Sequence, residues 1–284
     1  MEQNFKTKNL IFKAQKHTFH IVRPSPWPFL TSVSLLNLTI YTVLIFHEFK
    51  TSKLYLLISF VYFLTIIGMW FRDVVIESHQ GMHTLKVQRN FRYGMLVVLA
   101  SETMFFFGFF WCYFYMSLSP SIWIGNKWPP EGIIPINPLD LPLFNTIVLV
   151  SSGVSAVFSH KSIMRVDGRR GVTIGLVVTI VLGICFTACQ YYEYNNAPFS
   201  INDGIYGSIF YVSTGFHGLH VIIGTVAIIV CLIRHLYYHF LRDHHIGLEL
   251  SFWYWHFVDV IWILLYIVMY WGGCNLEEIF KLKN

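Results

Sequence analysis

Long apolar stretches, separated by short polar connectors, dominate the chain. Five of them contain no Asp, Glu, Lys or Arg and cover residues 24–47, 54–71, 141–160, 171–192 and 204–233. Two more, 93–119 and 250–274, each hold a single acidic residue, Glu102 and Asp259. An α-helix crosses a bilayer with about 20 mostly apolar residues, so the pattern predicts seven transmembrane helices. It does not show the alternation that is typical of a transmembrane barrel.

The composition favours a membrane protein and excludes most soluble classes. Of the 284 residues, 55% are hydrophobic and 12% are charged, where a soluble domain has about 25% charged residues. The net charge of +5 is spread over short connectors, so it does not form the basic face that nucleic-acid binding requires. Five cysteines without a C-x-x-C spacing exclude a disulfide framework and a zinc ribbon. We therefore expect an all-α membrane protein.

Basic residues in the connectors predict the orientation of the helices. Fifteen of the 20 Lys and Arg residues lie in the N-terminal segment and in the second, fourth and sixth connectors. Positively charged connectors stay on the inner side of a membrane, so we expect the N-terminus inside and the C-terminus outside. The predicted parts are an inside tail (1–23), a two-helix group with its inside connector (24–92), a five-helix group (93–274) and an outside tail (275–284).

Glu102 is the first candidate for a functional side chain within a span. Ionisable groups in a membrane usually face protein or mark a pathway. Glu102 has three interpretations: a protonated acid hydrogen-bonded to a neighbouring helix, a group in an ion or gas pathway, and a contact to lipid or another subunit. We favour the first, because burial away from water favours the neutral form of a carboxyl group.

Histidines within the spans have both structural and metal-binding interpretations. His217 and His220 are three residues apart, as are His256 and Asp259, so each pair shares one side of a helix. Two ligands do not make a metal site, and we interpret His217 and His220 as structural. We expect His256 and Asp259 to hold helices together. The sequence has no motif for haem attachment, for a metalloprotease, for phosphate binding or for a nucleophile elbow.

A cluster of basic side chains follows the sixth predicted span, and its members are Arg234, His235, His239, Arg242, His244 and His245. Long basic side chains at a helix end extend to the lipid head groups. We do not expect His244 and His245 to bind zinc together, because adjacent residues on a helix point in different directions.

Several motifs resemble subunit III of the haem–copper cytochrome c oxidases. The two strongest are TGFHGLHVIIG at 214–224 and WYWHFVDV at 253–260. Shorter matches are PSPWP at 24–28, WFRD at 70–73, RYGM at 92–95, WPP at 128–130, DGIYG at 203–207 and YWG at 270–272. These motifs occur in the family's order along nearly the whole chain.

The resemblance implies a fold and a role. It implies seven transmembrane helices in two groups, the first two and the last five, around a V-shaped lipid cleft. It further implies a non-catalytic core subunit of respiratory complex IV that carries no cofactor of its own, with haem and copper in partner subunits. The complex reduces oxygen to water and pumps protons. This subunit is implied to stabilise catalytic subunit I, to hold structural phospholipids and to support proton uptake and oxygen delivery.

The resemblance also implies a set of lipid-binding residues, since the family's cleft lipids are contacted from the second connector and from the end of the sixth span. Here that set is Arg72, Glu77, His83, Arg234 and His239. Phospholipids of the cardiolipin type, or of the phosphatidylglycerol and phosphatidylethanolamine type, are the expected ligands. Ile76 and Tyr237 stand where the family commonly has basic residues, so we expect fewer head-group contacts in this chain.

The implied partners are subunit I above all, then subunit II, accessory subunits and a respiratory supercomplex. The implied location is the mitochondrial inner membrane, with the N-terminus in the matrix and the C-terminus in the intermembrane space; a bacterial plasma membrane is the alternative. Two other functional classes stay open. One is a free-standing proton-coupled channel or transporter that uses Glu102 and Asp259, and the other is a membrane metalloenzyme that uses the histidines.

Overall fold

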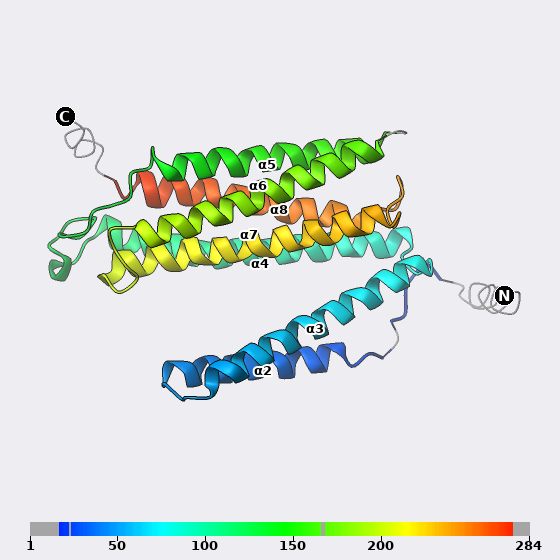
Figure 1. The fold of residues 1–284 in the computed structure, drawn as a ribbon, viewed down its shortest axis with the longest axis horizontal. Coiled ribbons are helices and arrows are strands. Elements are labelled where there is room, and N and C mark those ends of the chain that lie inside the picture. The colour runs from blue at the N-terminus through cyan, green and yellow to red at the C-terminus, as the bar shows by residue number, and fades with distance from the viewer. Residues whose placement is uncertain (1–16, 23, 166–167, 275–284) are drawn as a thin grey trace, which may run out of the picture. The chain divides into compact units, whose positions relative to one another are not determined.

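The computed structural model describes residues 17–22, 24–165 and 168–274. Its helices are α2 (Trp27–Phe46), α3 (Ser52–His79), α4 (Leu85–Leu118), α5 (Leu141–Ile163), α6 (Arg169–Asn196), α7 (Gly204–Leu236) and α8 (Ile246–Leu265), with short segments η1 (Ile122–Ile124) and η2 (Tyr266–Trp271) (Figure 1). The described residues contain no strand. Counting α8 and η2 together, seven helices are long and apolar enough to cross a membrane. The prediction of an all-α chain with seven spans is confirmed.

Several helices are longer than the apolar stretches that predicted them. α3 continues to His79, although its charge-free stretch ends at Phe71, and α4 begins at Leu85 instead of Tyr93. A helix satisfies its own backbone hydrogen bonds, so it can continue beyond the hydrocarbon with polar side chains. The apolar stretch therefore measures the embedded part of a helix and not its ends. The predicted outside tail (275–284) and most of the predicted inside tail (1–23) lie outside the described residues.

The chain forms two compact units, residues 1–93 and 94–284, and α4 continues from one into the other. In the first unit, α2 and α3 pack together. The indole N–H of Trp27, at the start of α2, donates to Asp73 Oδ2 near the end of α3 at 2.7 Å. Tyr41 and Tyr55 stack with 5.4 Å between their ring centroids. The two helices are therefore antiparallel.

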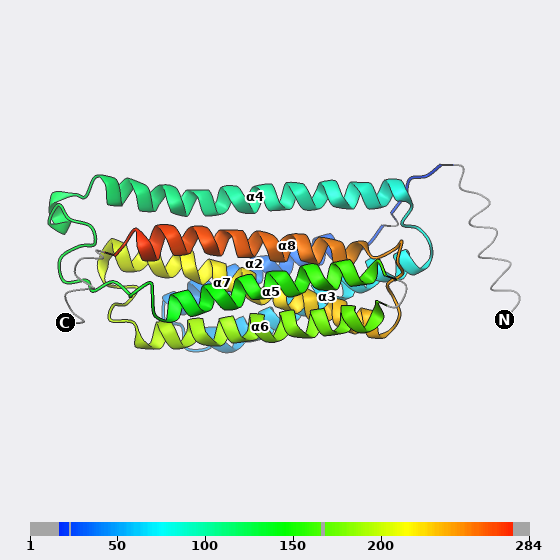
Figure 2. The same ribbon diagram turned by 90° about the horizontal axis from the view of Figure 1, so that it is seen from above.

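In the second unit, four helices form a closed ring. α5 packs on α6, α6 on α7, α7 on α8 and α8 on α5. Figure 2 shows these helices running along one another. The largest fully buried side chains of this unit include Trp255, Trp262, Phe186 and Phe252. Burying an aromatic side chain contributes the largest apolar area per residue, so these rings dominate the core.

Trp255 on α8 contacts three neighbouring helices. A β-carbon on Gly183 of α6 or on Gly224 of α7 would lie 2.8 Å from an atom of the indole ring. Glycine at both positions therefore lets α6 and α7 approach the ring. The indole N–H donates to Ser152 Oγ on α5 at 3.0 Å, so a single side chain positions three helices around α8.

The last span ends in η2, which has the wider turn of a π-helix. Such turns insert a residue relative to an α-helix. The Tyr266 hydroxyl donates to the Pro138 carbonyl at 3.1 Å, and the Tyr270 hydroxyl donates to Glu193 Oε1 at 2.6 Å. η2 thereby attaches the end of the last span to the connector before α5 and to the end of α6.

Candidate functional site

Glu102 on α4 and His220 on α7 form a hydrogen-bonded pair. His220 Nε2 lies 3.0 Å from Glu102 Oε2, and His220 Nδ1 lies 2.6 Å from the Phe216 carbonyl oxygen. Because a carbonyl oxygen only accepts, Nδ1 must carry a hydrogen. The remaining proton is shared between Nε2 and the carboxyl group. Either a neutral acid donates to a neutral imidazole, or an imidazolium donates to a carboxylate.

Aromatic rings surround this pair. The ring centroids of Phe106, Tyr254 and Phe105 lie 5.1, 6.2 and 6.5 Å from that of His220. The His220 side chain is 9% exposed, whereas the Glu102 side chain is 32% exposed. Glu102 thus makes a hydrogen bond to a neighbouring helix, as the favoured interpretation expects. Part of its side chain still faces outward, where lipid or another subunit would lie.

The interhelix hydrogen bond of His217 goes to a different helix from that of His220. His217 Nε2 lies 3.3 Å from the Val258 carbonyl oxygen on α8, and its ring centroid lies 4.9 Å from that of Trp262. The side chain is buried. The two imidazoles are one turn apart on α7 but have separate partners, so their spacing serves two helix contacts.

His256 and Asp259 lie at the contact between α8 and α5. His256 Nδ1 is 3.6 Å from Asp259 Oδ2; the Asp259 side chain is 11% exposed and that of His256 is 40% exposed. A β-carbon on Gly153 of α5 would lie 2.5 Å from Asp259 Oδ2. The carboxylate therefore points inward against the α5 backbone, while the imidazole lies toward the outside.

Glu193 is a buried acid that the sequence reasoning missed. Its Oε1 accepts from the Tyr270 hydroxyl at 2.6 Å and from Gln190 Nε2 at 3.2 Å. Asn145 Nδ2 on α5 donates to the side-chain oxygen Oε1 of Gln190 at 3.4 Å. The predicted apolar stretch ends at Tyr192, so it does not include Glu193, although α6 continues past it. The signal that would have found it is helical spacing, because Gln190 and Glu193 continue the buried side of α6 three residues apart.

In the first unit, Arg72 lies near the end of α3. Its Nη2 is 3.0 Å from Asp73 Oδ1, and the Arg72 side chain is 60% exposed. The other oxygen of Asp73 accepts from Trp27. Asp73 thus fixes the end of the α2–α3 pair, while the Arg72 guanidinium keeps most of its surface outside the fold, where a head group could contact it.

Glu77 and His83 lie close to a residue that the sequence reasoning did not select, His20. Each of the three side chains offers one ligand atom, and these atoms lie within 4.8 Å of one another. Within the described residues, this is the one group of three or more His, Cys, Asp or Glu side chains with such spacing. All three residues are half-buried.

In the second unit, Arg234 and His239 lie at the end of α7. The Arg234 guanidinium carbon lies 4.6 Å from the centroid of Phe240. The His239 backbone N–H donates to the Arg234 carbonyl at 3.0 Å. A β-carbon on Gly247 would lie 2.7 Å from Arg234 Nη1. Arg234 is therefore packed against the start of α8 and is less free than Arg72.

Arg169, at the start of α6, closes the end of α7. It donates from Nη2 to the Leu236 carbonyl at 3.1 Å, and its guanidinium carbon lies 3.2 Å from the centroid of Tyr238. The same two helix ends make a second contact, in which His235 Nε2 lies 3.3 Å from the Arg169 carbonyl oxygen. Cations are favourable at a helix C-terminus, where the last carbonyl groups lack partners.

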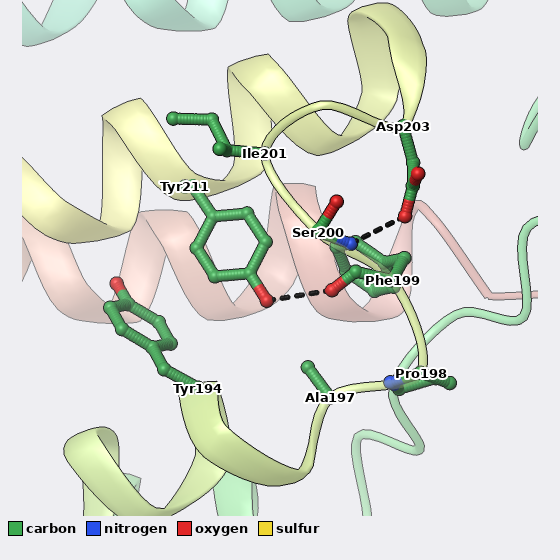
Figure 3. A pocket seen from close by; sticks show the side chains of 8 residues that line it. All are labelled: Tyr194, Ala197, Pro198, Phe199, Ser200, Ile201, Asp203 and Tyr211. Atoms are coloured by element: carbon green, nitrogen blue, oxygen red, sulfur yellow. Dashed lines mark hydrogen bonds between the residues drawn. The ribbon is translucent and has the colours of Figure 1, made fainter.

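A pocket of about 550 Å³ lies at the connector between α6 and α7 (Figure 3). The Tyr211 hydroxyl donates to the Phe199 carbonyl at 2.8 Å, and the Ser200 N–H donates to Asp203 Oδ2 at 2.6 Å. Tyr194, also at the pocket, donates to Thr214 at 2.7 Å. These polar groups hold the connector in its conformation, and we assign no ligand to the pocket.

Comparison with known proteins shows the family to which the chain belongs. Residues 17–274 match the family described as cytochrome c oxidase subunit III. Cytochrome c oxidase subunit 3 of Papio hamadryas is 51% identical over 261 residues, covering 91% of this chain and 98% of that protein. The protein of the same name from Prototheca wickerhamii is 48% identical over 261 residues, covering 91% and 99%. The chain belongs to the cytochrome c oxidase subunit III family.

Membership in the cytochrome c oxidase subunit III family confirms the resemblance drawn from the motifs. As a subunit III, the chain is a multi-pass membrane protein of the respiratory chain and is part of a complex with other subunits. The two strongest motifs lie on α7 and α8. They supply His217, His220, His256 and Asp259, so they coincide with the places where the helices of the second unit meet.

Proposed function

We propose that this chain is a non-catalytic core subunit of cytochrome c oxidase in the mitochondrial inner membrane. It stabilises catalytic subunit I during turnover and retains phospholipids beside it. Haem and copper are supplied by partner subunits, and subunit II and accessory subunits complete the complex. In this proposal the N-terminus faces the matrix, as the distribution of basic residues predicts.

One observation carries the proposal: apolar side chains cover the outward surfaces of the long helices. On α3, Leu57 is 59% exposed and Val61 is 55% exposed; on α4, Val97 is 70% exposed and Trp111 is 65% exposed. Exposed apolar area of this extent marks contact with lipid or with another protein. This surface supports an embedded subunit that lipid and other subunits cover.

Retention of phospholipid is supported by the basic side chains near the helix ends. Arg72 presents an exposed guanidinium, and Arg234 lies at the end of α7 beside Phe240. Each Lys or Arg near the surface attracts anionic head groups by about 1 kcal/mol. We assign Arg72, Glu77, His83, Arg234 and His239 to phospholipid contacts on the matrix side, with cardiolipin or a phosphatidylglycerol or phosphatidylethanolamine lipid as ligand.

Support of proton uptake and oxygen delivery is indirect in this proposal, through the conformation of subunit I. Glu102 and Asp259 each contact a histidine of the same chain. Both acids therefore contribute to contacts within the fold. A free-standing transporter, the alternative function, would need these acids to exchange protons with both sides of the membrane.

Affinity purification through a tag on this chain tests the proposal. We expect a complex that contains haem and copper. A complex stripped of the chain should start turnover at a similar rate and then lose activity after fewer cycles, and added phospholipid alone should not restore it. The proposal fails if the stripped complex is equally durable, or if the isolated chain conducts protons in vesicles and Glu102→Gln abolishes that conduction.

A further inference from the structure

His20, Glu77 and His83 lie together in the first unit although they come from separate parts of the chain. His20 precedes α2, Glu77 belongs to the last part of α3, and His83 lies in the turn between α3 and α4. Two imidazoles and one carboxylate, with a ligand atom from each within 4.8 Å of the others, form the donor set that zinc takes in open three-ligand sites.

Contacts of the neighbouring residues hold His20 at this turn. The Thr84 hydroxyl donates to the Thr18 carbonyl at 2.5 Å, and Lys86 Nζ lies 4.9 Å from the centroid of Phe19. The ring centroids of His20 and His83 are 6.3 Å apart. The two residues that precede His20 are thus fixed to residues that closely follow His83.

The other two ligands are also positioned by the fold. His83 packs edge-on against Phe91 with 5.0 Å between ring centroids. The Met82 N–H donates to the Glu77 carbonyl at 3.2 Å, which ties the turn to the end of α3. Glu77 and His83 are therefore held on one short, closed piece of backbone, and both are half-buried.

We propose that His20, Glu77 and His83 bind a divalent transition-metal ion, with zinc as the preferred metal. In a tetrahedral zinc site with bonds of about 2.0–2.1 Å, ligand atoms are about 3.3 Å apart. The ligand atoms of the three residues lie within 4.8 Å of one another, so binding requires the three side chains to move closer together. Imidazole ligands favour zinc, copper or nickel over magnesium and calcium, which prefer oxygen ligands.

The role of the metal follows from the places of its ligands. An ion held by all three residues would join the segment before α2 to the end of α3 and to the α3–α4 turn through its coordination bonds. A tetrahedral ion with three protein ligands keeps a fourth position for water. The ion would join parts of the fold, and it requires no electron transfer from this chain. Glu77 and His83 are also assigned to phospholipid contacts, so the inference rests on the proposed function: the fourth position is where a head-group phosphate would bind the ion.

Zinc binding to the purified oxidase complex tests the site. The complex is depleted with a chelator and then titrated with radioactive zinc, with haem content as the reference for stoichiometry. We expect the wild type to bind one more zinc ion per complex than His20→Ala or His83→Ala. Glu77→Gln, which keeps the size but removes the charge, should weaken this site by more than the roughly 10- to 100-fold that loss of an outer-shell partner costs.

His17→Ala is the matched control, because His17 is an exposed histidine in the same segment and lies outside the group of three. It should bind as much zinc as the wild type. A second measurement uses the unaltered complex: zinc should protect His20 and His83, but not His17, from modification by diethyl pyrocarbonate. Equal zinc stoichiometry and affinity in the wild type, His20→Ala and His83→Ala, or no protection of His20 and His83, would show that these residues hold no metal and would overturn the proposal.

Discussion

The carboxylate of Asp259 on α8 occupies the space that a side chain on Gly153 of α5 would need. A β-carbon at Gly153 would lie 2.5 Å from Asp259 Oδ2. The two helices therefore meet at a point where one of them presents only its backbone.

Replacing this glycine should loosen the contact between α5 and α8. We expect Gly153→Ala to destabilise the protein by about 1–3 kcal/mol, the usual effect of forcing extra atoms into a packed core. The measurement is the half-life of the purified complex at elevated temperature. Gly215→Ala is the control, since a β-carbon at Gly215 meets no atom within 4 Å.

A double variant shows whether Asp259 is the cause of the Gly153→Ala effect. Residues in contact have non-additive effects, so Asp259→Ala should cost less in the Gly153→Ala background than in the wild type. Strictly additive losses would show that the strain lies elsewhere on α5.

Ser152→Ala should destabilise the core by leaving the Trp255 indole N–H without its acceptor. An unsatisfied buried donor costs about 1–3 kcal/mol. Ser151→Ala is the matched control, because Ser151 is exposed and its hydroxyl donates to Ile147 in its own helix. Thermal inactivation of the complex measures both variants. Equal half-lives for the two would mean that the indole finds another partner.

Glu102→Gln should preserve assembly and proton pumping. With a hydrogen on His220 Nδ1, Nε2 can accept from the glutamine amide as it does from a protonated acid. The measurement is the number of protons released per electron by the complex in vesicles. Glu102→Ala, which removes the partner of Nε2, should assemble less well. A fully assembled Glu102→Gln complex that pumps no protons would make Glu102 an obligatory relay and refute this expectation.

Arg72→Ala combined with Arg234→Ala should release tightly bound anionic lipid. Two cations that each contribute about 1 kcal/mol to head-group binding together change retention by roughly 30-fold. Lipid analysis of the washed complex measures the loss. Lysine at both positions should retain most of the lipid, and Lys53→Ala is the control on the opposite predicted side. A double alanine variant that keeps all its anionic lipid and its durability in turnover would contradict the assignment.

Cysteine labelling tests the predicted orientation of the spans. Lys127 lies in the connector between α4 and α5, and Arg170 lies in the first turn of α6, so an odd number of spans separates them. We expect an impermeant thiol reagent to reach Lys127→Cys from the intermembrane side and Arg170→Cys from the matrix side. Labelling of both from one side would mean that α5 does not cross the membrane.

The number and positions of the spans could be predicted from the sequence, because each span needs a long apolar stretch that few other structures require. The pairing of Glu102 with His220 could not. It depends on α4 and α7 lying side by side, which follows from the packing of all the helices. The sequence marked both residues as unusual without relating them.

Two further misses have different physical causes. Glu193 falls outside the predicted span because that span contains no charged residue, whereas hydrogen bonds from Gln190 and Tyr270 allow the acid to be buried. His20 has no distinctive sequence pattern, because its importance lies in its distance from Glu77 and His83, and the chain between them forms the α2–α3 pair. A single sequence does not show which turn such a segment meets.

The π-helical end of the last span has a consequence for insertions and deletions. Chain ends usually tolerate gained or lost residues. Deleting one residue from α8 would turn every later side chain by about 100° around the axis. Tyr270 would then point away from Glu193, and the buried acid would lose its phenolic partner. A deletion within η2 instead removes the extra residue of the wider turn and leaves the later side chains on their sides of the helix, so the last span is constrained to the single residue in α8 and not in η2.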